Sequence, residues 1–440
     1  MSLGYISGSL PQEWETPFLK DMVYPKQWKT ISVKDLTPSG YTVYGANGKI
    51  GFYSEYTHEN PTIMLTCRGA TCGNIHISEP FSYINGNAMA LDNQPINLIG
   101  LHFLKYALQA RGLEDTISGS AQPQITRQGL EKVQVPLPPL AEQKIIAEKL
   151  DTLLAQVEST KARLEQIPQI LKRFRQAVLA SAINGRLTKE YRTNEFFGTQ
   201  ISLGELILNG PQNGLYKPSK FYGDGVKIIR IDSFYDGKIL GWDELKRVNV
   251  TDVEKNRWLL QEDDILINRV NSIEYLGKCA HVKALPEDTV FESNIMRFSI
   301  DTMIISPEYL TLFLCSTAGI KELRKNAKLA VNQASINQTD VKNCKLTLPA
   351  LAEQHEIVRR VEQLFAYADT IEKQVNNALA RVNNLTQSIL AKAFRGELTT
   401  QWRAENPDLI SGENSAAALL EKIKAERAPS GGKKASRKKS

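Results

Sequence analysis

The amino-acid sequence predicts an α+β protein in which two globular, mixed α/β domains alternate with two long helices that pair in a coiled coil. Three observations predict this fold class: a long internal repeat, a heptad pattern shared by both copies of the repeat, and two intervening stretches rich in glycine, asparagine and β-branched residues. At 440 residues the chain is too long for one core, and a chain of this length holds roughly two to four domains.

The internal repeat has an offset of 211 residues. Pro-Leu-Pro-Pro-Leu-Ala-Glu-Gln at 136–143 returns as Thr-Leu-Pro-Ala-Leu-Ala-Glu-Gln at 347–354. The match continues without a gap beyond the helices, where the identical pairs are Gly185/Gly396, Leu187/Leu398, Thr188/Thr399 and Arg192/Arg403. A match of this length indicates a tandem duplication.

Each copy of the repeat predicts one long helix. Apolar residues dominate the a and d positions over more than four heptads, which is typical of a coiled-coil seam. Two amphipathic helices on a globular core are the alternative, but the apolar stripe is narrow and both copies share one frame. Pro168 should kink or break the first helix because proline removes a backbone hydrogen bond. In the first copy the seam positions are Leu150, Leu153, Val157, Thr160, Leu164, Ile167, Leu171, Phe174, Val178 and Ser181.

The segments before each helix read as α+β domains with short strands. Ala46-Asn47-Gly48-Lys49 predicts a hairpin turn. One helical stretch is expected late in each segment, at 97–110 and at 306–326. The two segments also show weak sequence similarity to each other. The apolar runs at 63–68 and 265–269 are each followed by a glycine and then by an Asn-x-Met triplet.

These patterns divide the chain into six parts. An amphipathic helix is expected at 413–428, followed by a basic, disordered tail at 430–440. The parts are a first globular domain at 1–139, a first spacer helix region at 140–183, a linker at 184–200, a second globular domain at 201–350, a second spacer helix region at 351–395, and the C-terminal helix and tail at 396–440.

Composition excludes several classes of protein. The N-terminal stretch has no apolar core typical of a signal peptide, and no uncharged apolar run approaches the length of a membrane span. Five scattered cysteines suggest a reducing compartment and lack the usual zinc spacings. The net charge of +6 lies in the helical regions and the tail, while both globular segments are near neutral. We therefore expect a cytoplasmic protein whose composition alone does not indicate DNA binding.

Motifs that carry chemistry are missing. The chain has no phosphate-binding loop, dinucleotide fingerprint, metalloprotease or deaminase pattern, nucleophile elbow, or Asn/Asp-Pro-Pro-Tyr/Phe methyltransferase motif. Carboxylate pairs such as Asp263-Asp264 are better explained as solvated turns. The sequence therefore predicts a non-catalytic chain without a cofactor of its own.

The repeat and its surroundings resemble a known family. The architecture and the run Pro-Leu-Pro-Pro-Leu-Ala-Glu-Gln-Lys-Ile-Ile-Ala-Glu-Lys-Leu-Asp at 136–151 resemble the DNA-specificity subunit of type I restriction-modification enzymes, in particular the enterobacterial K/B-like (type IA) family. The resemblance covers essentially the whole chain. It implies that the globular segments are target-recognition domains, to which the segments at 44–51, 66–74 and 268–272 are similar.

The resemblance also implies partners. A specificity subunit of this family binds two modification subunits, which use S-adenosylmethionine to methylate adenine, and two restriction subunits, which use ATP and Mg for translocation and cleavage. It reads two short half-sites separated by unspecified base pairs. An antiparallel helix pair would suit this role, because a pseudo-two-fold axis would let two identical methyltransferases act on opposite strands. Helices of 32–44 residues would be about 48–66 Å long, enough for half-sites one turn of DNA apart.

Side-chain chemistry indicates candidate base-reading residues. Arginine and lysine suit guanine, and asparagine and glutamine suit adenine. The alternative is a structural role, such as a turn for Asn47 or an ion pair for Arg269. In the first domain the candidates are Tyr44, Asn47, Lys49, Arg68, Gln122, Gln124 and Arg127; in the second they are Lys217, Arg269, Asn271, Asn294, Asn332, Gln333 and Asn337.

The repeated Leu-Ala-Glu-Gln elements are candidate anchors for the two modification subunits. A patch duplicated on one chain would recruit two copies of one protein, although its apolar residues could instead pack only against their own domains. The candidates are Leu140, Ile145, Ile146, Leu351, Ile357 and Val358.

Two functions from other classes remain as alternatives. One is a coiled-coil adaptor with two protein-binding heads that reads no DNA. The other is a self-contained methyltransferase or nuclease, which the missing motifs disfavour.

Overall fold

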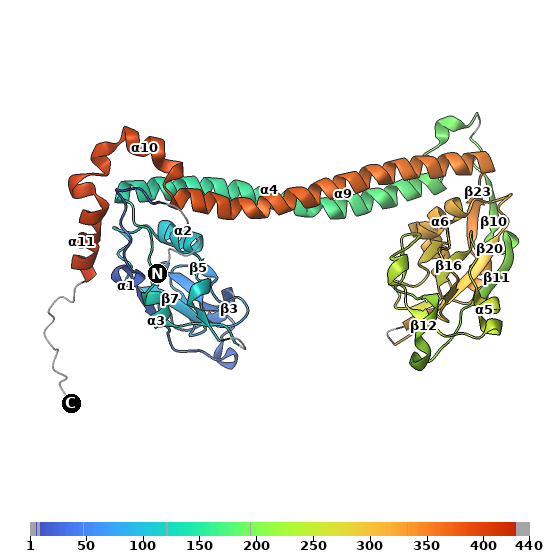
Figure 1. Cartoon of the computed structure of the whole chain (residues 1–440), viewed down its shortest axis with the longest axis horizontal. Coiled ribbons are helices and arrows are strands. Elements are labelled where there is room, and N and C mark those ends of the chain that lie inside the picture. Colours follow the sequence, from blue (N-terminus) through green and yellow to red (C-terminus); the bar gives the residue numbers. More distant parts are fainter. Residues whose placement is uncertain are drawn as a thin grey trace. The chain divides into compact units, whose positions relative to one another are not determined.

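The computed structural model of the chain forms two compact units. The first comprises residues 1–165 and 377–440, and the second comprises residues 166–376. Each unit holds one globular head together with one end of each long helix (Figure 1). The structure describes residues 6, 9–46, 48–119, 122–193, 195–331 and 333–427.

The first head is built on a four-stranded antiparallel sheet in the order β1-β7-β4-β5. All four residues of β4 are buried, and Phe103 and Leu104 of helix α2 share a hydrophobic core with Ile63 and Leu65 of that strand. A three-stranded sheet, β3-β2-β6, and a short β8-β9 hairpin complete the head. Its elements are α1 (Leu19–Met22), β1 (Tyr24–Lys26), β2 (Tyr41–Gly45), β3 (Gly48–Tyr53), β4 (Ile63–Thr66), β5 (Ile75–Ile77), β6 (Tyr83–Ile84), β7 (Ala88–Asp92), α2 (Leu101–Arg111), β8 (Ile117–Ser118), β9 (Gln124–Ile125) and α3 (Arg127–Glu131).

The second head repeats this architecture with additional strands. Its main sheet has the order β11-β20-β16-β18, and a second sheet has the order β15-β12-β19. Its elements are β10 (Thr199–Ser202), β11 (Ile207–Asn213), β12 (Tyr222–Ile229), β13 (Phe234–Tyr235), β14 (Lys238–Ile239), β15 (Arg247–Val248), α5 (Asp252–Trp258), β16 (Ile265–Asn268), β17 (Val270–Asn271), β18 (Cys279–His281), β19 (Thr289–Phe291), β20 (Ile295–Ile300), α6 (Pro307–Cys315), α7 (Thr317–Arg324), β21 (Lys328–Ala330), β22 (Gln333–Ser335), α8 (Gln338–Lys342) and β23 (Lys345–Leu348).

The two heads share one sheet topology. In each smaller sheet the central strand, β2 or β12, pairs antiparallel with one neighbour and parallel with the other. The β8-β9 hairpin corresponds to β21-β22. Gly73 and Gly277, which precede the equivalent strands β5 and β18, both have positive φ. The weak sequence similarity between the two globular segments therefore reflects a common fold.

Local differences from the sequence expectations have identifiable causes. The expected hairpin is present, with Gly45 paired to Gly48. The helix expected at 306–326 is two helices, α6 and α7, so that expectation was wrong. Ser316 is extended and ends α6, and its hydroxyl accepts a hydrogen bond from the Gly319 amide to cap α7. Gly319 is needed there, since a Cβ atom would lie 2.1 Å from the Phe313 carbonyl oxygen.

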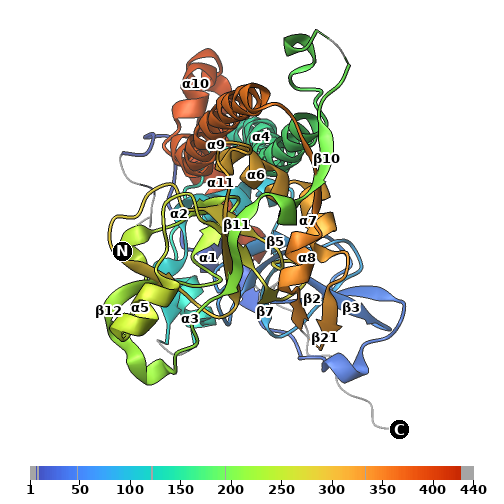
Figure 2. The same cartoon turned by 90° about the vertical axis from the view of Figure 1, so that its right-hand side faces the viewer.

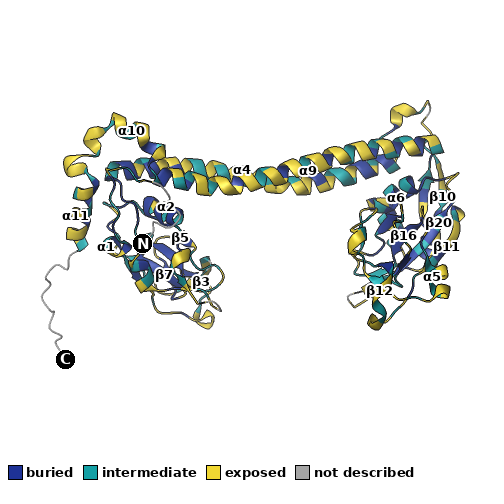
Figure 3. Ribbon diagram, in the orientation of Figure 1, coloured by how far each residue is buried: buried dark blue, intermediate teal, exposed yellow. Residues whose placement is uncertain are grey.

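The long helices are α4 (Leu140–Ile183) and α9 (Leu351–Phe394), each of 44 residues. Pro168 lies inside α4 and does not break it. A stripe of buried and half-buried residues follows most heptad positions on both helices, although Thr160 in the first stripe is exposed (Figure 3). The second stripe departs from the pattern near its end, where Leu385 is exposed and Thr386 is half-buried.

The two helices run antiparallel. In the first unit, Ile146 and Leu150 near the start of α4 share a core with Leu390 and Phe394 at the end of α9. In the second unit the end of α4 shares a core with the start of α9 in the same way. Figure 2 shows the two helices side by side. Two globular domains joined by an antiparallel coiled coil confirm the predicted fold class.

The C-terminal segment belongs to the first unit. Helix α10 (Thr400–Glu405) follows α9, and α11 (Ala416–Arg427) packs Leu419 and Ile423 into the core of the first head. Arg427 donates a hydrogen bond to the carbonyl of Lys20 in α1. The tail expected at 430–440 lies outside the described residues. Among the described helices, none has the length and apolar character needed to cross a bilayer.

Candidate nucleic-acid interface and the helix clasps

A buried carboxylate begins each long helix. Glu142, in the first turn of α4, is fully buried and accepts hydrogen bonds from three groups: Trp14 Nε1 at 2.8 Å, Thr399 Oγ1 at 2.6 Å and Arg403 Nη1 at 2.6 Å. Thr399 and Arg403 lie just beyond the end of α9. One carboxylate therefore fastens the start of one helix to the chain that leaves the other helix, an arrangement called here the clasp.

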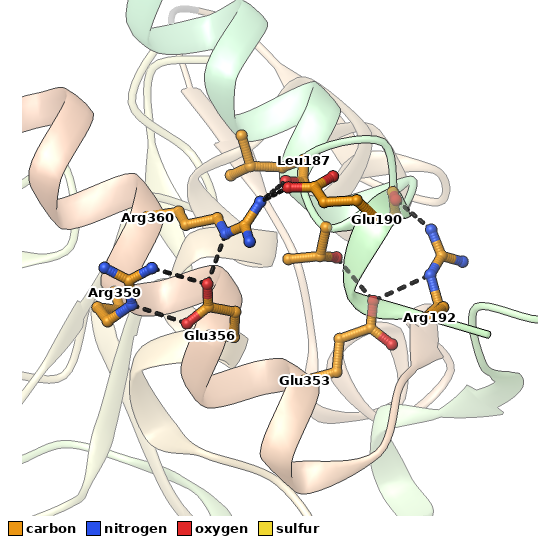
Figure 4. Close-up of polar contacts among 9 residues, drawn as sticks. Leu187, Glu190, Arg192, Glu353, Glu356, Arg359 and Arg360 are labelled. Atoms are coloured by element: carbon orange, nitrogen blue, oxygen red, sulfur yellow. Dashed lines mark hydrogen bonds and ion pairs between the residues drawn. The ribbon is translucent and has the colours of Figure 1, made fainter.

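The second unit contains the equivalent clasp. Glu353, in the first turn of α9, accepts a hydrogen bond from Thr188 Oγ1 at 2.6 Å and pairs with Arg192 Nε at 3.2 Å (Figure 4). Thr188 and Arg192 follow the end of α4. The identities that the sequence repeats outside the helices, Thr188/Thr399 and Arg192/Arg403, are thus the partners of the repeated glutamate.

A basic side chain seven residues, or about two turns, further along each helix reinforces the clasp. Lys149 of α4 donates to the carbonyl of Leu398, and Arg360 of α9 donates to the carbonyl of Leu187. Arg360 is also fixed by Glu190 and by Glu356, whose pKa is lowered to about 2 by hydrogen bonds from Arg359 and Arg360 (Figure 4).

Glycine is required where the chain turns from each helix into its clasp. Gly185 and Gly396 both have φ values in the left-handed region, +73° and +74°. A Cβ atom on Gly185 would lie 2.5 Å from the Phe197 ring, and one on Gly396 would lie 2.4 Å from Pro11. Glycine is therefore required at both repeated positions for the same geometric reason.

The glutamine of each Leu-Ala-Glu-Gln element orients a head against its helix. Gln354 accepts a hydrogen bond from the Ser306 amide at the start of α6 and donates to the carbonyls of Ile304 and Pro349. Gln143 makes the equivalent contacts, accepting from the Gly100 amide before α2 and donating to the carbonyls of Leu98 and Pro138. The repeated element thus serves the chain's own fold in both units.

This arrangement changes the interpretation of the candidate anchor residues. Ile146 and Ile357 have no exposed surface and lie in the cores of their own units, so the structure favours the alternative that they pack within the chain. The other four candidates, Leu140, Ile145, Leu351 and Val358, are half-buried and keep part of their surface accessible.

Three of the base-reading candidates in the first head lie together on its surface. Arg68 forms a backbone bridge with Gln124, and the Gly69 amide donates to the carbonyl of Pro123. Arg68, Gln122 and Gln124 are all exposed. The β8-β9 hairpin and the adjacent Arg68, which follows β4, therefore present one cationic and two amide side chains, the chemistry that reads guanine and adenine edges.

The other candidates in the first head have different environments. Tyr44 is a buried core residue whose hydroxyl accepts a hydrogen bond from the Glu79 amide, so a base contact by Tyr44 is corrected to a packing role. Lys49 is exposed and pairs with Glu79 at 2.5 Å, which raises the pKa of Lys49. Arg127 is exposed but stacks on Tyr24 and pairs with Glu131. Asn47 lies outside the described residues.

In the second head, three candidates surround or adjoin a polar cavity of about 580 Å³. Lys217 and Asn294 line it, and the Arg269 amide donates to the carbonyl of Asn294. Lys217 is largely covered and pairs with Glu254 at 2.8 Å. Arg269 donates to the carbonyl of Ser293, so the suggested carboxylate partner is absent among the described contacts of this side chain.

The remaining candidates of the second head lie on or beside the β17-β22-β21 sheet. Asn271 is half-buried in β17, and its side chain accepts a hydrogen bond from the Ser272 amide. Gln333 is exposed on β22. Asn337 caps α8, because its side chain accepts from the amides of Thr339 and Asp340. Asn332 lies outside the described residues.

Comparison with known proteins decides the family. The family model described as "Type I restriction modification DNA specificity domain" matches residues 11–169 and 203–381. The chain is a type I restriction-modification specificity subunit. It is 53% identical over 429 residues to the type I restriction enzyme EcoKI specificity subunit of Escherichia coli strain K12, an alignment covering 96% of this chain and 88% of that protein.

Other relatives of this specificity subunit agree. It is 46% identical over 424 residues to the StySPI specificity subunit of Salmonella potsdam, covering 95% of this chain and 88% of that one. Its fold is similar to a chain from a study of complex assembly in the type I R-M system, with a TM-score of 0.68 and 17% identity over 89% of this chain and all of that one. The HsdS subunit from Thermoanaerobacter tengcongensis gives a TM-score of 0.53 at 17% identity, covering 89% and 98%.

The structure of this specificity subunit also presents surface residues that sequence reasoning missed. Around the cavity of the second head lie Tyr216, which is exposed, and the basic residues Arg230 and Lys246. Leu329 and Val331 protrude from the β21-β22 hairpin. No short motif marks these residues, because their exposure depends on how the strands pack. In the described part of the chain, no three His, Cys, Asp or Glu side chains are grouped to hold a metal ion.

Proposed function

We propose that this specificity subunit binds a bipartite, asymmetric sequence in double-stranded DNA, with each head reading one half-site. The coiled coil sets the spacing of the half-sites and docks two methyltransferase subunits, so that the chain directs adenine methylation and restriction. The subunit itself is non-catalytic. Reading the two half-sites is a matter of base contacts, while phosphate contacts supply positioning.

The observation that carries this proposal is a common framework with different reading surfaces. Both heads have the same sheet orders and are fastened by equivalent clasps. At the equivalent hairpins both heads present the repeated glutamine, Gln122 or Gln333, but the first head adds Gln124 whereas the second adds Leu329 and Val331. A common framework with different surfaces suits the recognition of two different sequences.

The duplication also supports two identical partners. The start of each long helix has the same surroundings, set by Glu142 and Gln143 in one unit and by Glu353 and Gln354 in the other. A protein that recognises one of these regions would find the other equally acceptable. We assign S-adenosylmethionine to the two methyltransferase subunits, and ATP and Mg to two restriction subunits. The proposed location is the cytoplasm, where such a complex meets DNA.

The test is an exchange of heads. Residues 1–135 are replaced by the corresponding head of a relative, and the methylated adenines of cells carrying the hybrid and its methyltransferase are mapped by sequencing. One half-site should change and the other should persist. A change in both half-sites would contradict the division of labour.

The adaptor alternative predicts a different result. A scaffold with protein-binding heads would leave the methylated sequence unchanged after the exchange. Incubation of the chain alone with labelled S-adenosylmethionine and DNA tests the enzyme alternative, which requires methyl transfer without partners.

A further inference from the structure

The β21-β22 hairpin of the second head ends in exposed apolar side chains. Leu329 is 75% exposed and Val331 is 92% exposed, although both are aliphatic. Leu329 lies directly across from Ala334, which is only 2% exposed. The inner strand of the hairpin is thus anchored in the head, while the outer strand extends beyond the core.

The hairpin pairs with the rest of the head from one side only. Strand β22 lies between β17 and β21, so β21 is the free edge of a three-stranded sheet. Just before β21, Arg324 donates two hydrogen bonds to the carbonyl of Leu276 and fastens the end of α7. The described strands therefore leave the outer strand of the hairpin uncovered.

Charge around the hairpin favours a polyanionic partner. Lys321, Lys325 and Lys328 are exposed in α7, in the turn after it and in β21. None of these three ammonium groups has an ion-pair partner among the described residues. Lysines of this kind contact phosphates and position a protein on the duplex.

The equivalent hairpin of the first head lacks the apolar residues. Gln124 and Ser335 are equivalent in the repeat and pair with Ser118 and Lys328 respectively. The residue after Ser118 is Gly119, so a glycine takes the place of Leu329. The apolar tip is therefore a feature of one head and not of the shared framework.

We infer that the β21-β22 hairpin enters the major groove of the second half-site and that Leu329 and Val331 read thymine through its methyl group. This inference rests on the proposed function and names the base contact made by one part of the second head. The major groove admits a two-stranded β-ribbon, and thymine is the one base with a methyl group there. Each half-site has an A·T pair, because each contains a methylated adenine.

The test removes only the methyl groups. The complex of this chain with its methyltransferase subunits is titrated with duplexes in which each thymine of the second half-site is replaced in turn by uracil. At one or more positions, uracil should weaken binding of the unaltered complex about 4-fold, the value of one buried methyl group. The double variant Leu329→Ser/Val331→Ser should bind both duplexes equally well.

Matched variants separate reading from positioning. Lys328→Ala should weaken binding to thymine and uracil duplexes by the same factor, since a phosphate contact carries no base information. Val253→Ser changes an exposed valine on α5 of the same head. This variant should show the same ratio of thymine-duplex affinity to uracil-duplex affinity as the unaltered complex. Uracil in the first half-site should affect the complex and its variants alike.

Several outcomes would overturn the inference. The first is equal binding of thymine and uracil duplexes at every position by the unaltered complex. The second is a double variant that keeps the unaltered ratio of thymine-duplex to uracil-duplex affinity. The third is a double variant that loses a methyltransferase subunit in native mass spectrometry while this ratio stays unchanged. The last outcome would mean that the hairpin packs against a protein. Failure of the proposed function itself is recognised separately, because the head exchange would then change neither half-site or change both.

Discussion

The carboxylate of Glu142 and the guanidinium of Arg403 form a 2.6 Å ion pair across 261 residues of sequence. Glu353 and Arg192 form the equivalent pair in the other unit. Each pair joins the beginning of one long helix to the segment that follows the other. The two helices are equal in length, at 44 residues, so both clasps can close at once on one antiparallel pair.

Loss of the Glu142 carboxylate should loosen the first unit alone. Glu142→Ala leaves Arg403 and Trp14 without their buried acceptor, and breaking a buried pair by removing one partner costs about 3–5 kcal/mol. Hydrogen exchange measured by mass spectrometry should show faster exchange around Trp14 and around 396–405, with little change in the second unit.

Two further variants complete this test. Glu353→Ala should show the mirror pattern, with faster exchange around 185–192 and an unchanged first unit. Glu148→Ala, which removes an exposed carboxylate from α4, should change the free energy of unfolding by no more than about 0.5 kcal/mol. Equal loosening of both units by Glu142→Ala would show that the clasp is not local.

Replacement of Gln354 by leucine should detach the second head from the start of α9. The variant keeps the size of the side chain but leaves the Ser306 amide and the carbonyls of Ile304 and Pro349 without that partner. A buried group left unsatisfied costs about 1–3 kcal/mol. Protection of the Ser306 region against hydrogen exchange should fall, whereas Gln363→Leu, at an exposed position of α9, should leave it unchanged.

The carboxylate of Glu356 predicts an acid-dependent contribution to stability. Hydrogen bonds from Arg359 and Arg360 lower the pKa of Glu356 from 4.5 to about 2. A folded-state pKa below the unfolded value gives stability that is complete above the unfolded value and is lost as the pH falls through the folded value. The contribution should therefore be constant from pH 7 to 5 and decline between about pH 4.5 and 2.

This acid dependence is measured as the difference between the urea midpoints of the unaltered chain and the Glu356→Gln variant. The difference should be steady near neutrality and should shrink as the pH falls from about 4.5 to 2, because the carboxyl of the unfolded chain is protonated over this range while that of the folded chain is only about half protonated at pH 2. A difference that stays constant down to pH 2 would contradict the assignment.

Sequence reasoning predicted the features that depend on local periodicity. The heptads of α4 and α9 recur within a few residues, and their observed bounds are close to the expected ones. The clasps were visible as repeated identities but not as contacts, because Glu142 and Arg403 are far apart in the chain. The repeat nevertheless contains the clue. The glutamate, the threonine and the arginine are identical in both copies, and pairing them would have predicted both clasps.

The candidate base readers show where side-chain chemistry alone fails. Tyr44 has a suitable side chain, but the packing of two sheets buries it. Asn337 could have been assigned from sequence, since Asn337 followed by Asp340 is a capping-box pattern. Leu329 and Val331 could not, because apolar residues are normally expected inside and their exposure depends on the free edge of β21.

The last prediction concerns the length of the spacer. Removing one heptad from each helix, 157–163 from α4 and 380–386 from α9, keeps the seam in frame and leaves both clasps intact. Each helix becomes about 10.5 Å shorter at 1.5 Å per residue, which corresponds to about three base pairs. Binding to duplexes with unchanged half-sites and successively shorter spacings should therefore be tightest about three base pairs below the native spacing.

Removing 380–386 from α9 alone provides the matched comparison. The helices would then differ by about 10.5 Å, so the Glu142 clasp and the Glu353 clasp could not both close. That variant should lose specific binding at every spacing and show faster hydrogen exchange at one clasp. If the double deletion instead retains the native spacing, or if it changes the bases of either half-site while the spacing stays the same, then the helices do not set the distance between the two recognised sequences.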